Sequence, residues 1–472
     1  MKYLILLTLY FLYFYWEIIK NPYSIASAES IDADFGSFRL SGECWRKGRI
    51  PYDPYYYKNL PGSRTGTFYP LNIVFSWVSS FFDLDTAWNL YLFNVLLHSY
   101  ATMVLAYFLF NQGLTGLFGA LAWGFMAYHV KCTLWHTETF AWMTALLLSL
   151  SHQFWPGVSL GFLFLCGHPS HIFFFLYVVF ILYPKQMFMA LPMALLTGFP
   201  QIMAFYEYKK LSIRDDYTPD DMLAIGKMPF WAYIFMFIPW RIRDHVADVG
   251  YEEWCLYLTP VVGILALFSQ NWLLWGLIIG AVILSTGKGY KWLYKLMMNQ
   301  RGPYKWGYIA GLLIIMQSVN GLNRLMLADK QLTLICILTA TLLLYNRETL
   351  LLYPFKAIGD RPSKMFSSPL LEWLSINAKG WKVNNLPHPV YTGQINHIET
   401  PGYTGGNHIA VLGKFLGIPK QGEAPYNWFN YHKDGEKLDA FGIKYHVGNH
   451  PPSANHKWKK VKNFGLWVNT NL

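Results

Sequence analysis

Two acidic residues, Asp32 and Asp34, follow the first hydrophobic segment and begin a polar stretch rich in Pro, Gly and Tyr. A carboxylate placed where water meets a bilayer can deprotonate an acceptor hydroxyl, which is the base chemistry needed to transfer a sugar from a lipid phosphate. Such a transfer also needs cationic groups that stabilise the phosphate as it leaves. An Asp before Phe-Gly-Ser can equally cap a helix, so the spacing alone leaves both interpretations open.

Basic residues that could hold a phosphate occur in two places. Arg214 belongs with Glu207 to a charged cluster that follows a hydrophobic segment, and Arg301 and Lys305 precede another. The planar guanidinium group of arginine fits a phosphate bidentately. Long charged side chains at the end of a hydrophobic segment are also common as a solvated rim. These residues are therefore candidates for substrate binding, with the solvated rim as the structural alternative.

Histidines occur in two closely spaced groups. His136 and Glu138 are two residues apart, which on a helix directs their side chains to different faces, and Glu138 can simply stabilise a helix start. His168 and His171 are three residues apart and share one helix face. A metal would need a third ligand, which the sequence does not identify, so we expect no metal or other cofactor. A polar contact between helices or with a substrate suits ionisable groups inside a membrane.

Motifs for other chemistries are absent from the sequence. Gly287-Lys288-Gly289 lacks the GxxxxGK[ST] pattern of a nucleotide-binding loop, and there is no GxSxG or HExxH motif. The aromatic residues of the polar stretch, Tyr69 among them, suit stacking on sugar faces. Aromatic residues at an interface are also common membrane anchors.

The elements that must position these residues are mostly hydrophobic helices. Of 472 residues, 54% are hydrophobic and 14% are charged, whereas roughly a quarter are charged in an ordinary soluble protein. A hydrocarbon core of ~30 Å requires about 20 apolar residues. The pattern predicts a polytopic α-helical membrane protein of about 11 helices, near residues 2–20, 87–110, 114–130, 138–153, 157–168, 171–183, 187–204, 253–269, 271–286, 305–326 and 331–353.

Three segments lie outside these predicted spans. The polar stretch 21–86 is expected to be a large first extracytoplasmic loop, in which 35–45 forms an amphipathic helix beside the membrane. A second outer loop is expected at 205–252, and its apolar patch at 228–240 is typical of an interfacial helix. Hydrophobicity falls after residue 353, which predicts a transmembrane domain at 1–353 and a small α+β extramembrane domain at 354–472. Its strands are expected near 408–412, 444–447 and 464–468.

The N-terminal segment resembles a signal peptide, because Ala26-Ser27-Ala28 looks like a cleavage site. We expect a retained first helix, since 1–19 is long, rich in aromatic residues and contains Glu17. With the N-terminus inside, the two loops and the C-terminal domain share the outer face, although the basic segment 287–304 there opposes the positive-inside rule. The net charge of +11 favours anionic lipids over nucleic acid as partners. The five cysteines form no disulfide framework.

Several short motifs follow one another along the chain. The first loop contains Ser41-Gly42-Glu43, Pro51-Tyr52-Asp53-Pro54-Tyr55 and Phe68-Tyr69-Pro70-Leu71-Asn72, and later segments contain His136 with Trp142, Gly167-His168-Pro169, Pro200 to Arg214, Arg301-Gly302-Pro303-Tyr304-Lys305 and Leu438 to Tyr445. In this order they resemble the motifs of the bacterial YfhO-like membrane proteins of the GT-C glycosyltransferase class. Tyr52-Asp53 departs from the Trp-Asn that is usual in the family, and Ser170 stands where Gln is common.

The resemblance implies a GT-C-like bundle in the bacterial cytoplasmic (inner) membrane. It implies transfer of a sugar from a polyprenyl-phosphate donor to a glycan or lipid acceptor of the cell envelope, on the outer face. The base would be an acid of the first loop, with Asp34 best placed and Asp32 the alternative. The substrate would be bound by Arg214, Glu207, His136, His168, Arg301, Lys305 and Tyr69.

Two further expectations follow from the resemblance. The segment 464–472 looks like a family strand that normally continues into further structure, so the chain is expected to be truncated at its C-terminal end. A lipid-linked-sugar transporter or a non-catalytic envelope assembly protein on the same scaffold is the alternative function. A transporter would have inverted repeats and discontinuous helices at the bilayer midplane, and the sequence contains no convincing internal repeat.

Overall fold

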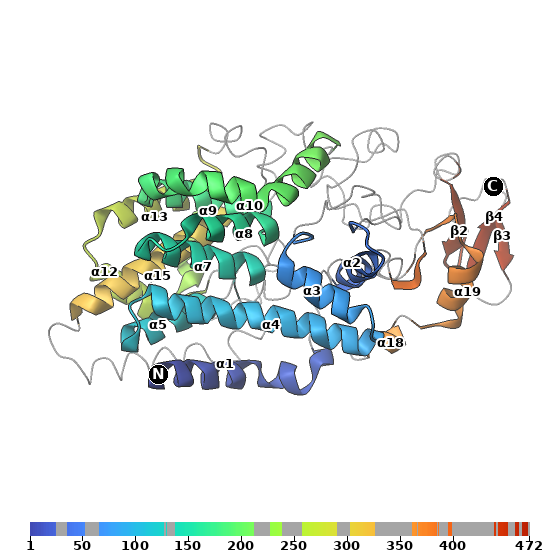
Figure 1. Cartoon of the computed structure of the whole chain (residues 1–472), viewed down its shortest axis with the longest axis horizontal. Helices are drawn as coiled ribbons and strands as arrows, with labels where there is room; N and C mark the ends of the chain where they lie inside the picture. Colours follow the sequence, from blue (N-terminus) through green and yellow to red (C-terminus); the bar gives the residue numbers. More distant parts are fainter. Residues whose placement is uncertain are drawn as a thin grey trace. The chain divides into compact units, whose positions relative to one another are not determined.

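The structure is a computed structural model, mostly helical with one small sheet (Figure 1). It describes residues 1–24, 35–51, 66–126, 129, 137–211, 227–237, 257–289, 303–325, 361–365, 367–384, 386, 395–398, 439, 442–451, 458–461 and 465–470. Contacts divide the chain into two compact units. The first unit contains Met1–Pro22, Val95–Pro200 and Thr218–Phe355, and the second contains Tyr23–Asn94, Gln201–Tyr217 and Lys356–Leu472.

The first unit is a helical bundle. Its described elements are α1 (Lys2–Lys20), the larger part of α4 (Leu84–Leu109), α5 (Gly113–Gly124), α7 (Thr137–His152), α8 (Pro156–Cys166), α9 (Pro169–Leu182), most of α10 (Pro184–Leu211), the 3-10 helix η5 (Phe230–Met236), α12 (Pro260–Leu267), α13 (Trp272–Ser285) and α15 (Lys305–Leu325). Several of these helices begin at a proline, which lacks the N–H that a first helical residue does not need.

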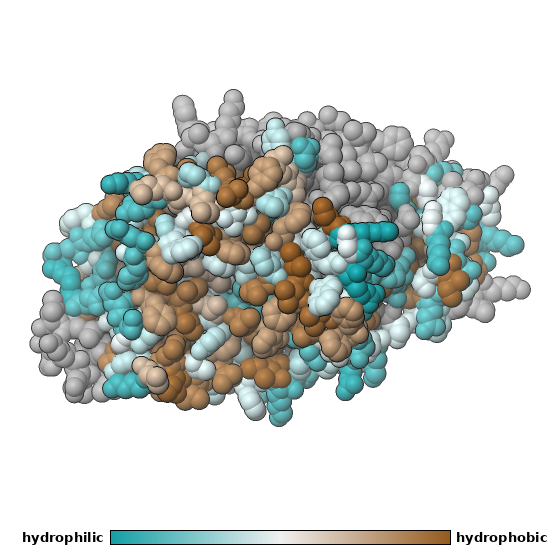
Figure 2. Space-filling model, viewed as in Figure 1, coloured by the Kyte–Doolittle hydropathy of each residue, from teal (hydrophilic) through white to brown (hydrophobic). Residues whose placement is uncertain are grey.

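Three of the described helices are long and apolar enough to cross a membrane: Lys2–Lys20, Leu84–Leu109 and Pro184–Glu207. Shorter apolar helices accompany them, and large hydrophobic side chains remain exposed on several (Figure 2). Such a surface is expected where lipid replaces water as the solvent. These features agree with a helical membrane protein. The helix expected near 331–353 lies outside the described residues, so the number of spans stays a prediction.

The predicted helix boundaries agree with the structure at most positions. The largest differences are a helix expected at 253–269, which is shortened to α12, and one expected at 114–130, which ends as α5 at Gly124. The helix expected at 187–204 continues as α10 to Leu211, so the first residues of the outer loop expected at 205–252 are helical. Pro260 explains the first difference, because it takes the N1 position of α12. The stretch 228–240 was expected to form an interfacial helix, and its described part contains the shorter 3-10 helix η5. Its location at a membrane interface stays a prediction.

Helix α15 lies at the centre of the bundle, where it packs against α5, α9, α12 and α13. Most of its side chains are buried around the whole circumference, as expected of a helix enclosed by others. Gly321 permits the closest approach, because a Cβ there would overlap the carbonyl oxygen of Leu265 in α12. Gln317 of α15 also binds the turn before α13: its Nε2 donates to the Asn271 carbonyl (2.8 Å), and its Oε1 accepts from Ser269.

The second unit contains helices from the segment that the sequence treats as a loop. A short 3-10 helix, η1 (Pro22–Ser24), follows α1, and α2 (Gly36–Arg46) confirms the expected amphipathic helix. Helix α3 (Pro70–Ser79) was not predicted. It packs against α2 so closely that a Cβ at Gly42 would overlap the Ser76 carbonyl oxygen.

Two arginines of α2 hold the end of α3. Nη1 of Arg39 donates to the Ser79 carbonyl, and Nη1 of Arg46 donates to the Ser80 carbonyl at 2.9 Å. The last carbonyls of a helix lack partners within the helix, and its C-terminal end attracts positive charge. The α2–α3 hairpin is therefore fixed both by backbone approach and by charge.

The C-terminal part of the second unit contains α18 (Pro362–Met365), α19 (Pro369–Asn377) and a sheet in the order β1-β2-β4-β3. The strands are β1 (Lys382–Asn384), β2 (Ile443–Val447), β3 (Trp458–Val461) and β4 (Leu466–Asn469). Strand β2 pairs parallel with β1 and antiparallel with β4, which also pairs antiparallel with β3. Leu371 and Leu374 of α19 share a core with Val383, Tyr445 and Leu466.

The sheet confirms that this part is α+β. The strands expected at 444–447 and 464–468 correspond to β2 and β4, whereas β1 and β3 were not predicted. The strand expected at 408–412 lies outside the described residues. The division into domains at 1–353 and 354–472 stays a prediction.

Candidate functional site

Three helices of the first unit, α7, α9 and α15, begin at the same end of the bundle. The backbone N–H of His168, which caps α9, donates to Oγ1 of Thr139 in the first turn of α7 (3.0 Å). The ring of His171 lies 5.8 Å from that of Tyr308 in the first turn of α15, and Phe140 contacts both rings, at 6.0 and 5.6 Å. Each helix N-terminus carries a partial positive charge, although the N–H groups of Trp306 and Gly307 in α15 already donate to the carbonyls of Pro303 and Tyr304. The convergence of these N-termini makes this end of the bundle attractive to anions.

A buried histidine joins this cluster from the segment after α5. Nδ1 of His129 lies 2.5 Å from the Trp123 carbonyl oxygen, and Nε2 lies 2.8 Å from the Tyr308 hydroxyl. A carbonyl oxygen only accepts, so Nδ1 must carry a proton. In the neutral ring Nε2 then accepts the hydrogen bond that Tyr308 donates. This pair of bonds fixes the orientation of both rings, and Phe140 packs against His129 at 4.2 Å.

His168 and His171 form a second pair, as their spacing predicts. Their Nδ1 atoms are 3.4 Å apart, with His171 only 2% exposed and His168 half-buried. Only one of the two Nδ1 atoms can donate to the other, so a single proton lies between them. No group of three His, Cys, Asp or Glu side chains in the described part of the chain is arranged to hold a metal ion.

Lys305 is the first residue of α15 and is 6% exposed. Its Nζ lies 5.5 Å from the ring centroid of Tyr304. Its ammonium group therefore brings a positive charge to the end of the bundle at which α15 begins.

Glu138 supplies a carboxylate to the same neighbourhood. It lies in the first turn of α7, is half-buried, and is close enough to Cys166 to act on the thiol electrostatically. Cys166 ends α8, just before His168. Glu138 is thus a carboxylate in the same turn of α7 as Thr139, whose hydroxyl accepts the His168 N–H.

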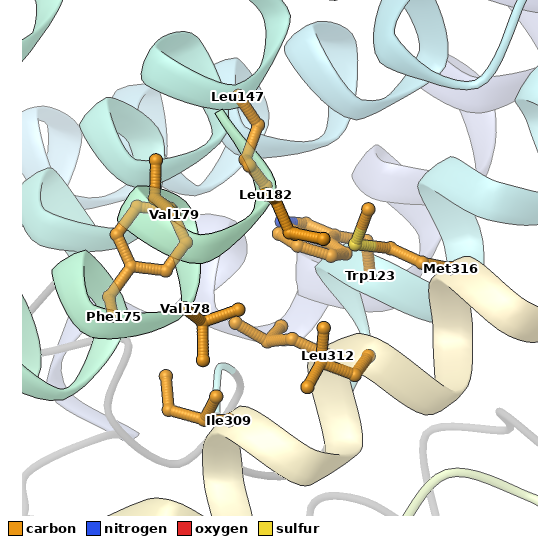
Figure 3. A pocket seen from close by; sticks show the side chains of 10 residues that line it. Trp123, Leu147, Phe175, Val178, Val179, Leu182, Ile309, Leu312 and Met316 are labelled. Carbon is orange, nitrogen blue, oxygen red and sulfur yellow. The ribbon is translucent and has the colours of Figure 1, made fainter. Parts of the chain in front are cut away.

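Deeper in the bundle, the same helices enclose an apolar cavity (Figure 3). It is lined by side chains of α5, α7, α9 and α15, including Trp123, Phe175, Val179, Leu312 and Met316. Its volume is about 10 Å³, roughly the minimum for a single water molecule. This cavity is a packing gap and has no room for a sugar or a prenyl chain.

The remaining predicted site residues fall into two groups. Asp32, Asp34, His136, Arg214 and Arg301 lie outside the described residues, and their roles stay predictions.

Glu207 and Tyr69 belong to the second unit. Glu207 is exposed near the end of α10. Tyr69 precedes α3 and is 2% exposed, so its ring is part of the packing of that unit. Substrate contact by either residue stays a prediction.

Sequence reasoning missed His129, Thr139 and Tyr308. His129 carried a usable signal, because an ionisable residue within an apolar stretch is a functional candidate by default. Tyr308 gave no such signal, since the bundle contains many tyrosines. The His129–Tyr308 contact joins positions 179 residues apart, a separation that no local pattern reveals.

No model of a known protein family matches the chain, and no curated protein matches it. The resemblance to the YfhO-like proteins therefore rests on the order of the motifs alone. Any function must be argued from the residues and their geometry.

Proposed function

We propose that the chain is a membrane glycosyltransferase that moves a sugar from a polyprenyl-phosphate donor to a cell-envelope acceptor. The observation that carries the proposal is the convergence of the α7, α9 and α15 starts around Lys305 and the histidine pair, at the end of an apolar bundle. Three helix N-termini and a buried ammonium group suit a phosphate, and the adjoining apolar helices suit a lipid tail. A lipid-linked phosphate combines both properties.

The catalytic base in this proposal is Asp34, with Asp32 as the alternative. Asp34 is bonded to Phe35, which is fully buried and packs against Trp88 and Tyr91, with ring centroids at 5.2 and 5.9 Å. The chain is therefore anchored one residue after the carboxylate. A base must be held in place to be effective, and an anchored neighbour supports that role.

The proposed step is a displacement with inversion at the anomeric carbon. Asp34 takes the proton of the acceptor hydroxyl, and the acceptor oxygen forms the new glycosidic bond. The bond between the anomeric carbon and the phosphate oxygen breaks, and the electron pair leaves with the lipid phosphate. Within the first unit, Lys305 and His168 are the described groups proposed to stabilise this anion, while the predicted parts of Arg214 and Arg301 lie outside the described residues. No metal or other cofactor takes part in the step as proposed.

The test is transfer of a radiolabelled sugar from polyprenyl phosphate by the purified protein in proteoliposomes. We expect Asp34→Asn to lower the rate at least about a hundredfold, the usual contribution of a general base. Glu372→Gln is the matched control, because Glu372 is an exposed acid of α19 in the C-terminal part. It should retain the parent rate.

Each of three outcomes would contradict this mechanism. Transfer that survives both Asp34→Asn and Asp32→Asn removes the first-loop base. If the same transfer is lost in Glu138→Gln, the base is the carboxylate of α7. Movement of the labelled lipid across the liposome membrane without transfer would instead assign the alternative function, a lipid-linked-sugar transporter.

A further inference from the structure

Helix α3 presents a stripe of exposed apolar side chains. Leu71, Val74 and Trp77 recur at intervals of three residues, and Phe81 and Phe82 continue the stripe beyond the helix. Val74 is 54% exposed, Trp77 44% and Phe81 55%. The opposite side of the helix is used for packing, since Ser76 and Ser79 are buried. The stripe is therefore a second, outward face of a helix whose other face is already occupied.

Cationic side chains lie beside this stripe. Arg46, Lys47 and Arg49 are exposed at the end of α2. The Arg46 guanidinium carbon is 5.6 Å from the ring centroid of Phe81, and its Nη1 donates to the Ser80 carbonyl. Positive charge is thus fixed against the end of the apolar stripe.

An exposed acid, Asp83, follows Phe82 and partly opposes these cations. Its Oδ1 accepts the backbone N–H of Thr86 (2.7 Å), and this bond holds the pKa of the carboxyl below its usual value. Asp83 is therefore charged at neutral pH. Three cations still exceed one acid, so the margin of the stripe is positive.

We propose that the α2–α3 hairpin is an interfacial anchor for an anionic bilayer. The apolar stripe enters the boundary between headgroups and acyl chains, to a depth of about 5–10 Å. Arg46, Lys47 and Arg49 then lie at the level of the lipid phosphates. Hydrophobic residues over α3 adjoin hydrophilic residues over α2 in Figure 2.

The rest of the chain favours lipid over a protein partner, because three of its described helices are long and apolar enough to cross a membrane. Aromatic residues and arginine are also enriched in protein interfaces, but lysine is depleted there, whereas aromatic residues with flanking Lys and Arg are typical of the headgroup region. This anchor is independent of the proposed transferase activity, because it uses none of the residues assigned to the phosphate or to the base.

The test is photo-crosslinking of the full-length protein in nanodiscs that contain zwitterionic and anionic phospholipids in known ratio. Benzoyl-phenylalanine replaces Val74, and mass spectrometry identifies the adducts. Position 376 is the matched control, because Ile376 of α19 is also an exposed apolar residue, at 69%. A nitroxide at position 74, read by its relative accessibility to oxygen and to a water-soluble nickel chelate, gives a second measure of depth.

We expect lipid adducts at position 74 and none at position 376. Anionic lipid should be enriched among the adducts roughly fivefold, which is the effect of one cation near a membrane surface. A triple variant with Arg46→Gln, Lys47→Gln and Arg49→Gln should lose this enrichment. The ratio of anionic to zwitterionic lipid among its adducts should then equal the ratio in the nanodiscs. Adducts to protein, equal labelling at both positions, or an unchanged lipid ratio in the triple variant would each overturn the proposal.

Discussion

The buried polar side chains of the first unit are bound to one another at specific atoms. His129 accepts from Tyr308 and donates to a carbonyl, and His168 binds both Thr139 and His171. Buried polar groups cost free energy unless they are hydrogen-bonded, and a network of them specifies one packing arrangement. At the residue scale, the cluster therefore orders the starts of three helices, at the end of the bundle where we propose that a phosphate binds.

Tyr308→Phe tests the ordering role. The change removes the hydroxyl that donates to Nε2 of His129 and leaves a buried acceptor unpaired, which costs about 1–3 kcal/mol. We expect a lower midpoint of thermal unfolding in detergent. Tyr13→Phe is the control, because Tyr13 is 64% exposed and its loss should change stability by less than about 0.5 kcal/mol. Equal midpoints for the two variants would contradict the role of the bond.

His446 of β2 allows a pH prediction outside the membrane. Burial lowers the pKa of this side chain from 6.5 to about 4, and its ring packs edge-on against Trp458. The unfolded state binds the proton more tightly, so the sheet is most stable above pH 6.5 and loses stability as the pH falls toward 4. Hydrogen exchange in β2 and β4, corrected for the intrinsic rate, should show this loss. His446→Gln should reduce it, and an unchanged pH profile would exclude His446 as the cause.

Part of the candidate site could be predicted from the sequence, and the rest could not. His168 and His171 lie together, as their spacing of three residues suggests, although only His171 is inside α9 and His168 is its N-cap with an extended backbone. The burial of Tyr69 could not be predicted from the sequence. An aromatic residue in a polar stretch suggests exposure, but α3 was not predicted and it carries Tyr69 into the interior.

At the scale of elements, prolines and glycines determine how the helices begin and meet. Prolines at the first position of α8, α9 and α12 set boundaries that a hydrophobicity pattern places only approximately. The helices themselves were predictable because long apolar runs have no other stable form in lipid. Helix α3 was not, because its ten residues are too few to cross a membrane.

Gly321→Ala tests the contact between α12 and α15. The new Cβ would overlap the Leu265 carbonyl oxygen, so the helices must separate, at a cost of about 1–3 kcal/mol. Gly276→Ala in α13 is the matched control, because nothing lies within 4 Å of its added Cβ. Thermal unfolding should show a loss for Gly321→Ala and no loss for Gly276→Ala. Equal stability would mean that the close approach does not contribute.

At the scale of the whole molecule, α1 is an integral part of the first unit. Thr8 Oγ1 lies 2.7 Å from the Tyr100 hydroxyl of α4, and Phe14 packs against Phe125 after α5, with ring centroids 4.4 Å apart. Leu7 and Phe14 are fully buried. Removal of α1 as a signal peptide would expose this surface.

We therefore predict that the purified protein retains α1. Peptide mapping by mass spectrometry should recover the residues of α1, and a tag placed before α1 should remain attached in the membrane fraction. A chain that begins at Glu29, after Ala26-Ser27-Ala28, would contradict the prediction.

The strand order of the C-terminal sheet has a consequence for biosynthesis. Strand β4 lies between β2 and β3 and supplies the antiparallel partners of both. It is also the last of the four strands to leave the ribosome, since it comprises Leu466–Asn469. Until then β2 and β3 have no common neighbour, and their hydrophobic side chains are available to chaperones or to other nascent chains. A premature stop just before Leu466 should therefore produce an aggregation-prone protein, because β2 and β3 lose the strand that pairs with both.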